Sequence, residues 1–244
     1  GRNESVEKGL FMHGVILLAA GSGARMGKEI SDKILEPIGS SNAFKMSLEA
    51  FASVMEIQIF VIAFREENQR KALQTIVDRM EQLKVRKNVL FVKGGMERGD
   101  SVRNALNMLP QSCRYVHIHD CARPMIRKQT VEALVRAVNK KQSVSLARPA
   151  PNTIRRKLNN DELSETKTLP RNELWIMETP QSAPISWLIE GYSKAKEMGI
   201  DITDDMHAIE LISKKMNLMD PGYPNPKITY RHDLKFISSL LNHE

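Results

Sequence analysis

The chain contains little cysteine and no long apolar run. Only two cysteines, Cys113 and Cys121, occur in 244 residues, which excludes a disulfide scaffold and favours a reducing compartment. The longest apolar run covers residues 15–20, whereas a membrane helix needs roughly 18–20 apolar residues. The first twelve residues also lack the apolar segment of a secretory signal. We therefore expect a protein without a membrane partner.

Aromatic residues are scarce as well, at 5%, although the chain is basic, with a net charge of +7 and a pI near 9.4. Nucleic-acid modules cluster their basic residues and add aromatic platforms on which bases stack. Here Lys and Arg are spread along the chain, so we expect no nucleic-acid partner. Anionic small molecules, phosphates above all, account for the same positive charge.

Short apolar strands alternate with amphipathic, helix-length stretches over the first 147 residues. Strands are expected at residues 14–20, 57–64, 89–92, 115–119 and 143–147, and helices at 42–54, 69–83, 101–109 and 130–139. This alternation predicts an α/β fold with a doubly wound, mostly parallel sheet and helices on both faces. Hydrophobic residues make up 41% of the chain, which is enough for a large core.

The alternation breaks between Arg148 and Trp175. Two short polar stretches, residues 153–156 and 167–169, flank an Asn-Asn-Asp turn and predict a protruding β-hairpin arm. An isolated hairpin is marginally stable, so we expect this arm, residues 148–175, to pack on a partner subunit. Helices at 185–198, 203–214 and 233–241 and a strand at 216–219 complete a single domain over residues 12–241. Residues 1–11 are expected to be disordered or foreign to the domain.

Two glycine turns follow apolar strands and predict a phosphate site. The first, residues 18–27, reads LAAGSGARMG, and glycines of this kind let backbone N–H groups approach phosphate oxygens. The dinucleotide fingerprint does not match, because Met26 stands where it needs glycine. The P-loop pattern does not match this turn either. A plain structural turn is the alternative. Arg25 and Lys33, eight positions apart, favour binding of a triphosphate instead.

A second turn and a carboxylate are expected at the same crevice. Residues 94–101 hold Gly95 and Arg98 before Ser101, which is itself a candidate helix N-cap. Asp120 comes directly after a buried strand. Because α/β sheets bind ligands beyond the carboxyl ends of their strands, these residues should meet the first turn. A carboxylate in that place can hold Mg²⁺ against nucleotide phosphates.

Two further patterns have simple structural explanations. His117 and His119 share a strand face and are either a metal pair or a packed, hydrogen-bonded pair, and the second interpretation is favoured because no third ligand lies nearby. Residues 203–205, Thr-Asp-Asp, are expected to cap a helix, with Thr203 as the N-cap and acids in the first turn.

Six ordered blocks give the chain a family resemblance from Gly14 to about Leu241. They are LAAGSGARM, GGMERGDSV, HDCARP, LPRNELWIMETPQ, TDDMHAIE and NPKIT. Together they resemble the 2-C-methyl-D-erythritol 4-phosphate cytidylyltransferase family of the non-mevalonate isoprenoid pathway. The resemblance implies transfer of a cytidylyl group from CTP to a sugar-alcohol phosphate, with release of pyrophosphate and Mg²⁺ or another divalent cation as cofactor. It also implies a homodimer, in a bacterial cytoplasm or a plastid stroma.

The resemblance implies roles for individual residues. The catalytic residues would be Arg25, Lys33, Arg171 and Lys227, and the nucleotide would contact Ala19, Ala20, Gly21, Gly23, Gly95, Arg98 and Ser101. The acceptor would contact Arg123, Thr153, Arg171 and Thr179, and Asp120 would bind the metal. Thr153 and Arg171 lie on the arm and would reach the site of the other subunit. The chain departs from the family at Asp32, which precedes Lys33 in place of the usual proline.

Two alternatives to this function stay open. One is the sister activity, cytidylyl transfer to ribitol 5-phosphate, which shares the core motifs. The other is a non-catalytic relative that binds a nucleotide or RNA and has lost turnover.

Overall fold

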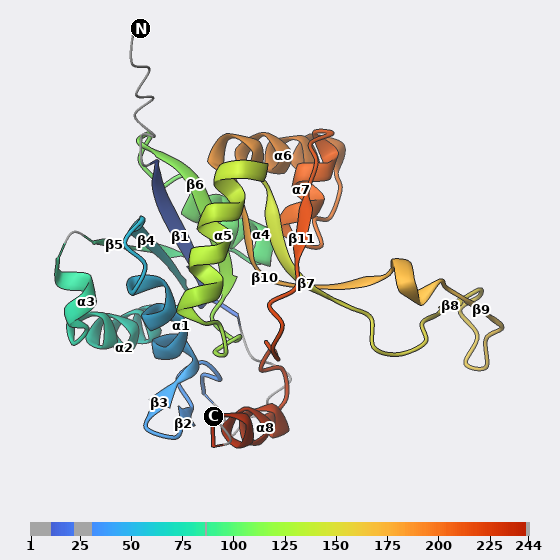
Figure 1. Ribbon diagram of the computed structural model, residues 1–244, viewed down its shortest axis with the longest axis horizontal. Helices are drawn as coiled ribbons and strands as arrows, with labels where there is room; N and C mark the ends of the chain where they lie inside the picture. Colours follow the sequence, from blue (N-terminus) through green and yellow to red (C-terminus); the bar gives the residue numbers. More distant parts are fainter. Residues whose placement is uncertain (1–10, 22–30, 86, 243–244) are drawn as a thin grey trace, which may run out of the picture.

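A seven-stranded sheet forms the centre of the computed structural model, which describes residues 11–21, 31–85 and 87–242 (Figure 1). The strands are β1 (Met12–Leu18), β4 (Ile57–Phe64), β5 (Asn88–Lys93), β6 (Cys113–Asp120), β7 (Val144–Pro149), β10 (Trp175–Pro184) and β11 (Asn217–Met219). They lie in the order β11-β7-β10-β6-β1-β4-β5. Pairs β1–β4, β1–β6, β4–β5 and β7–β11 are parallel, while β10 is antiparallel to both its neighbours. The predicted doubly wound, mostly parallel sheet is confirmed.

Helices cover both faces of the sheet because β1 and β4 carry apolar side chains on both sides. Along β1, Val15 and Leu17 belong to one buried cluster and Ile16 to the other, as the two-residue period of a strand requires. The first cluster includes side chains of α1 (Ala43–Ala52), α2 (Glu67–Asp78) and α5 (Lys128–Lys141). The second includes α4 (Arg98–Leu106), α6 (Ile185–Met198) and α7 (Asp205–Leu211). None of the helices in the described ranges has the length and apolarity of a membrane span.

Four helix predictions were wrong in detail. The expected helix at residues 69–83 is two helices, α2 and α3 (Glu81–Lys84), because the backbone is extended at Met80. Met80 and Leu83 are nevertheless buried in the cluster that holds α2, so the apolar period continues across the break. The N-caps are Glu97 rather than Ser101 for α4, and Asp204 rather than Thr203 for α7. The last helix, α8, begins earlier than expected and covers Arg231–Leu241.

The sequence pattern did not predict β10, although this strand lies between β6 and β7. Its sequence, WIMETPQSAP, is polar and contains two prolines, which is unusual for a central strand. The polar side chains are buried because they have partners: Ser182 Oγ lies 2.7 Å from His117 Nδ1, and Gln181 Nε2 donates to Asp204 Oδ2. Pairing with β7 is interrupted between Met177 and Gln181, and Thr179 in this interval lies beside Asp120 at the carboxyl end of β6.

A two-stranded hairpin extends away from the sheet (Figure 1). Its strands, β8 (Arg155–Lys157) and β9 (Thr166–Thr168), pair antiparallel, and all of their residues are exposed. A short 3₁₀ helix, Arg171–Glu173, leads back to β10. A second small hairpin, β2 (Pro37–Ile38) with β3 (Ser41–Asn42), precedes α1 and was not predicted.

Buried histidines make the stability of the fold sensitive to pH. Burial lowers the pKa of His13 and of His117, whose rings lie 3.0 Å apart from Nδ1 to Nε2. These rings stay neutral in the folded state but protonate near pH 6.5 when the chain unfolds. Their contribution is therefore present above the unfolded pKa and is lost as pH falls below it, by at most ~1.4 kcal/mol per pH unit and group.

We expect the free energy of unfolding, measured in urea at pH 7, 6 and 5, to decline toward pH 5. His117→Asn should make that decline shallower, because one group that resists protonation is gone. His232→Asn is the matched control, since the His232 side chain is 78% exposed. An equal slope in wild type and His117→Asn would contradict this account.

Candidate active site

The carboxyl ends of four neighbouring strands border a cavity of about 360 Å³. Residues 19–21 follow β1, Arg65 follows β4, Gly95 follows β5, and Asp120 ends β6. Of the residues proposed from the sequence, the cavity brings together Ala19, Ala20, Gly21, Lys33, Gly95, Arg98, Ser101, Asp120 and Lys227. Gly23 and Arg25 lie outside the described residues. The two glycine turns thus meet at one crevice.

Close packing between the turns requires glycine at position 94. A Cβ placed there would lie 2.5 Å from the Ala20 Cβ and 2.8 Å from Ser101 Oγ. The Gly94 N–H also donates to the Phe64 carbonyl at 2.7 Å, which ties the turn to β4. Ser101 does not cap its helix; its Oγ accepts the Gly95 N–H at 3.1 Å. The second turn therefore packs against Ala20 of the first turn at a distance that only a glycine at position 94 permits.

A second cavity, of about 320 Å³, lies next to the first. Arg98, Asp120 and Lys227 line both, so these three side chains form a wall between them. The second cavity is otherwise lined by Arg123, Met177, Glu178, Thr179, Gln181, Thr203 and Asp204. The predicted acceptor residues Arg123 and Thr179 thus line the second cavity, on the other side of this wall from the glycine turns. Two ligands bound in these cavities would meet at Asp120.

Asp120 is held between two cations. Arg98 Nε lies 3.2 Å from Oδ1 and Lys227 Nζ lies 2.7 Å from Oδ2. Burial opposes ionisation of Asp120, but the charges of Arg98 and Lys227 outweigh it and hold its pKa well below the usual range. Asp120 is therefore a carboxylate at every physiological pH.

Both histidines of β6 are packed and hydrogen-bonded, as the favoured interpretation predicted. His119 Nδ1 lies 3.0 Å from Thr179 Oγ1, and its Nε2 lies 3.0 Å from the Arg123 carbonyl. Burial lowers the pKa of His119 to about 4, so the ring is neutral. The Asp120 N–H donates to the same Thr179 hydroxyl at 3.1 Å, so Thr179 connects β6 to β10 beside the wall. In the described residues no group of three or more His, Cys, Asp or Glu is arranged to hold a metal.

Sequence reasoning missed a polar network that supports the first turn. Arg65 Nη1 donates to the Gly21 carbonyl at 2.9 Å, and its Nη2 lies 3.4 Å from Asp32 Oδ2. Gln69 donates to the Ala19 carbonyl at 2.9 Å and to the same Asp32 oxygen at 2.5 Å. The departure at Asp32 was visible in the sequence, but its partners lie more than thirty residues away. Asp32 therefore anchors the side chains that hold the turn.

Thr153 and Arg171 do not join these cavities within one chain. Both are exposed, and Arg171 Nη1 contacts the Pro151 carbonyl at 3.3 Å near the root of the hairpin. Their predicted role in acceptor binding stays a prediction.

These features define a nucleotide-binding α/β domain, in which glycine turns and a cation-flanked carboxylate meet at the carboxyl edge of parallel strands. Comparison with known proteins makes the assignment specific. The profile of the 2-C-methyl-D-erythritol 4-phosphate cytidylyltransferase (IspD) family matches residues 13–243. The chain belongs to this family.

Individual relatives cover nearly the whole chain. A protein of Bacillus cytotoxicus named 2-C-methyl-D-erythritol 4-phosphate cytidylyltransferase is 31% identical over 231 residues, 95% of this chain and 98% of the relative. A protein of the same name from Clostridioides difficile is 29% identical over 96% of this chain and 95% of the relative. The crystal structure of 4-diphosphocytidyl-2C-methyl-D-erythritol synthase from Anaerococcus prevotii has a similar fold, with a TM-score of 0.81 at 22% identity over 96% of this chain and 99% of that one.

We expect Arg65→Met to weaken CTP binding by about tenfold, because the Gly21 carbonyl loses its charged hydrogen-bond donor and the first turn loosens. Titration calorimetry with CTP measures the effect. Arg70→Met is the matched control, since the Arg70 side chain pairs with the exposed Glu67 on α2. Equal CTP affinity in the two variants would contradict a supporting role for Arg65.

Proposed function

We propose that this chain transfers the cytidylyl group of CTP to 2-C-methyl-D-erythritol 4-phosphate and releases pyrophosphate. The observation that carries the proposal is the wall of Arg98, Asp120 and Lys227 between two cavities. CTP is assigned to the cavity that the glycine turns border, because backbone N–H groups and cations suit a triphosphate. The acceptor is assigned to the cavity with Arg123 and Thr179. The names of the relatives support the choice of both substrates.

The reaction needs positioning and charge stabilisation more than proton transfer. An oxygen of the acceptor phosphate attacks the α-phosphorus of CTP, and the bond from that phosphorus to the β-phosphate oxygen breaks. Pyrophosphate leaves with the electron pair. The acceptor phosphate is already anionic near pH 7, so no general base is required. Lys33 and Lys227, with Arg25 by family resemblance, are assigned to the negative charge that develops at the α-phosphate.

The donor set at Asp120 fits Mg²⁺. This ion takes oxygen ligands, and proteins hold it with one or two carboxylates together with substrate phosphates. Asp120 supplies one ionised carboxylate on the wall that both cavities share. The other ligands would be phosphate oxygens and water. When bound, the ion would neutralise phosphate charge, which Lys33 and Lys227 do from the protein side.

We assign the hairpin to a homodimer in which it completes the site of the partner. Thr153 and Arg171 are exposed in one chain, and the hairpin stands away from the sheet (Figure 1). Leu163 at its tip is 95% exposed and Leu158 is 55% exposed, so the hairpin offers apolar surface to a second subunit. Arg171 would then contact the acceptor bound in the partner.

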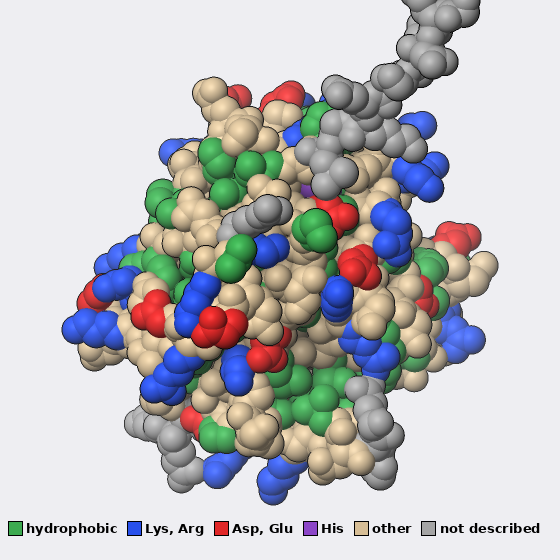
Figure 2. Space-filling view, turned by 60° about the vertical axis from the view of Figure 1, so that its left-hand side comes forward, with side chains coloured by type: hydrophobic (Ala, Val, Ile, Leu, Met, Phe, Trp, Pro, Cys, Tyr) green, Lys and Arg blue, Asp and Glu red, His purple; other side chains and the backbone are tan. Residues whose placement is uncertain are grey.

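The alternatives are less well supported. Figure 2 shows one face on which basic and acidic side chains are interspersed, and the described part of that face has no continuous basic stripe that would track an RNA backbone. Ribitol 5-phosphate as acceptor is kept as an outcome of the test.

Pyrophosphate release from CTP tests the proposal directly. With Mg²⁺ present, we expect release with 2-C-methyl-D-erythritol 4-phosphate and much slower release with ribitol 5-phosphate, because the relatives of this chain are named for the first acceptor. ATP should replace CTP poorly. Faster release with ribitol 5-phosphate would select the sister activity, and no release with either acceptor would favour a non-catalytic relative.

Mixing two inactive variants tests the shared site. Lys227→Ala and Arg171→Ala should each be nearly inactive as homodimers. After co-refolding in equal amounts, half of the dimers are mixed, and one of their two sites has an intact core and an intact arm. Activity should return to about a quarter of wild type, provided the sites are independent. If mass measurement confirms mixed dimers and activity does not recover, the hairpin does not act across the dimer.

A further inference from the structure

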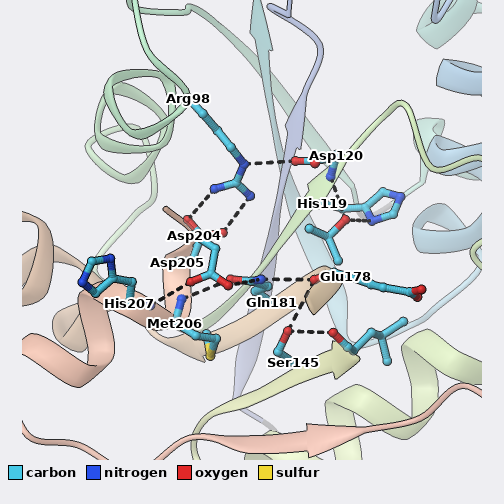
Figure 3. A network of polar contacts seen from close by, with 12 residues as sticks. Arg98, His119, Asp120, Ser145, Glu178, Gln181, Asp204, Asp205, Met206 and His207 are labelled. Atoms are coloured by element: carbon cyan, nitrogen blue, oxygen red, sulfur yellow. Dashed lines mark hydrogen bonds and ion pairs between the residues drawn. The ribbon is translucent and has the colours of Figure 1, made fainter. Parts of the chain in front are cut away.

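The second acid of the Thr-Asp-Asp segment has a role that capping does not explain. Asp204 is the N-cap of α7, with its Oδ1 accepting the His207 N–H at 2.9 Å. Asp205 instead points inward and is fully buried. Arg98 Nη1 and Nη2 donate to its two carboxylate oxygens at 3.1 and 2.9 Å, and the Tyr192 hydroxyl donates to Oδ1 at 2.6 Å. Figure 3 shows Arg98 between Asp205 and Asp120.

The position of Asp205 is fixed from two sides. The side chain of Gln181 on β10 accepts the Met206 N–H at 3.1 Å and donates to Asp204 Oδ2 at 3.1 Å, which anchors the start of α7 to the sheet (Figure 3). On the other side, α6 packs so closely on α7 that a Cβ at Gly191 would lie 2.2 Å from the Ala208 carbonyl oxygen. Tyr192 follows Gly191 and so meets Asp205. The carboxylate is therefore a rigid part of the fold.

This arrangement decides how Arg98 meets Asp120. A guanidinium binds a carboxylate most strongly through two parallel N–H groups. Arg98 uses its Nη1 and Nη2 groups, the Nη1/Nη2 edge, for a bidentate pair with Asp205. It therefore contacts Asp120 through Nε. Without the Asp205 carboxylate, Arg98 would be free to turn its Nη1/Nη2 edge toward Asp120. The guanidinium would then contact both Asp120 oxygens and compete with Lys227 for Oδ2, whereas Arg98 now contacts Oδ1 alone.

We propose that Asp205 is a positioning residue that binds the Nη1/Nη2 edge of Arg98 and so keeps the Asp120 carboxylate accessible to a divalent cation and to Lys227. The inference rests on the proposed function in that it takes Asp120 as the metal-binding carboxylate. It gives Asp205 no contact with substrate. Its effect passes entirely through Arg98.

Binding of Mn²⁺ in the presence of CTP, followed by electron paramagnetic resonance, tests this without turnover. Asp205→Asn keeps the size of the side chain and should weaken Mn²⁺ binding by about tenfold, because a freed Arg98 pairs with Asp120. The Mg²⁺ concentration for half-maximal activity should rise by the same factor, while kcat at saturating Mg²⁺ should change little. Asp201→Asn, an exposed acid before α7, is the matched control and should bind Mn²⁺ as wild type does.

A double variant separates positioning from structural support. Arg98→Met combined with Asp205→Asn removes the competing guanidinium as well as the carboxylate that holds it. Mn²⁺ binding, measured at a CTP concentration that saturates each variant, should therefore be stronger than in Asp205→Asn alone. If Asp205→Asn does not fold, Tyr192→Phe removes one hydrogen bond to Asp205 and should show a smaller loss of Mn²⁺ affinity.

Three results would overturn the inference. They are wild-type Mn²⁺ affinity in folded Asp205→Asn, or in Tyr192→Phe when that variant stands in for it; a double variant that binds no better than Asp205→Asn; and a wild-type chain that binds no Mn²⁺ with CTP. A wild-type chain that binds Mn²⁺ and CTP but releases no pyrophosphate would refute the proposed function and leave this inference standing.

Discussion

The pairing of Asp120 with Arg98 and Lys227 is the interaction on which the rest of the site depends. A carboxylate that is 8% exposed is costly to bury unless cations compensate its charge. Those cations come from α4 and from the segment before α8, which lie 22 and 107 residues away along the chain. The three side chains thus bring distant segments together at the end of β6. The same three side chains separate the two cavities. The balance of charge on Asp120 therefore affects ligand binding in both cavities.

Much of the fold was predictable because local pattern and position in the sheet agree. The strands β1, β4 and β6 are buried on both faces, as parallel strands of such a sheet require. The glycine turns follow β1 and β5, and Asp120 ends β6. The rule that α/β sheets bind ligands at the carboxyl edge then places residues 19–21, Gly95 and Asp120 at one crevice. Lys33 and Lys227 also reach that crevice. Lys33 was expected there as a cation close to the first glycine turn, whereas only the family resemblance predicted Lys227.

The parts that the sequence did not predict depend on pairings between distant polar residues. Strand β10 is polar and contains proline, and it becomes a central strand only because His117, His119 and Asp204 supply partners for its buried side chains. The same is true of Arg65 with Asp32, and of Arg98 with Asp205. Each member of these pairs is an ordinary surface residue by local pattern. Only the tertiary structure shows that their charges are compensated.

We expect the two substrates to meet at the wall formed by Arg98, Asp120 and Lys227. The most direct test is a crystal structure of the chain with CTP, Mg²⁺ and an acceptor phosphate bound. We predict the triphosphate in the cavity bordered by the glycine turns, with the α-phosphate at Lys227 and the acceptor phosphate facing it from the cavity of Arg123 and Thr179. A triphosphate bound away from Asp120, or an acceptor on the far side of the molecule, would contradict the account.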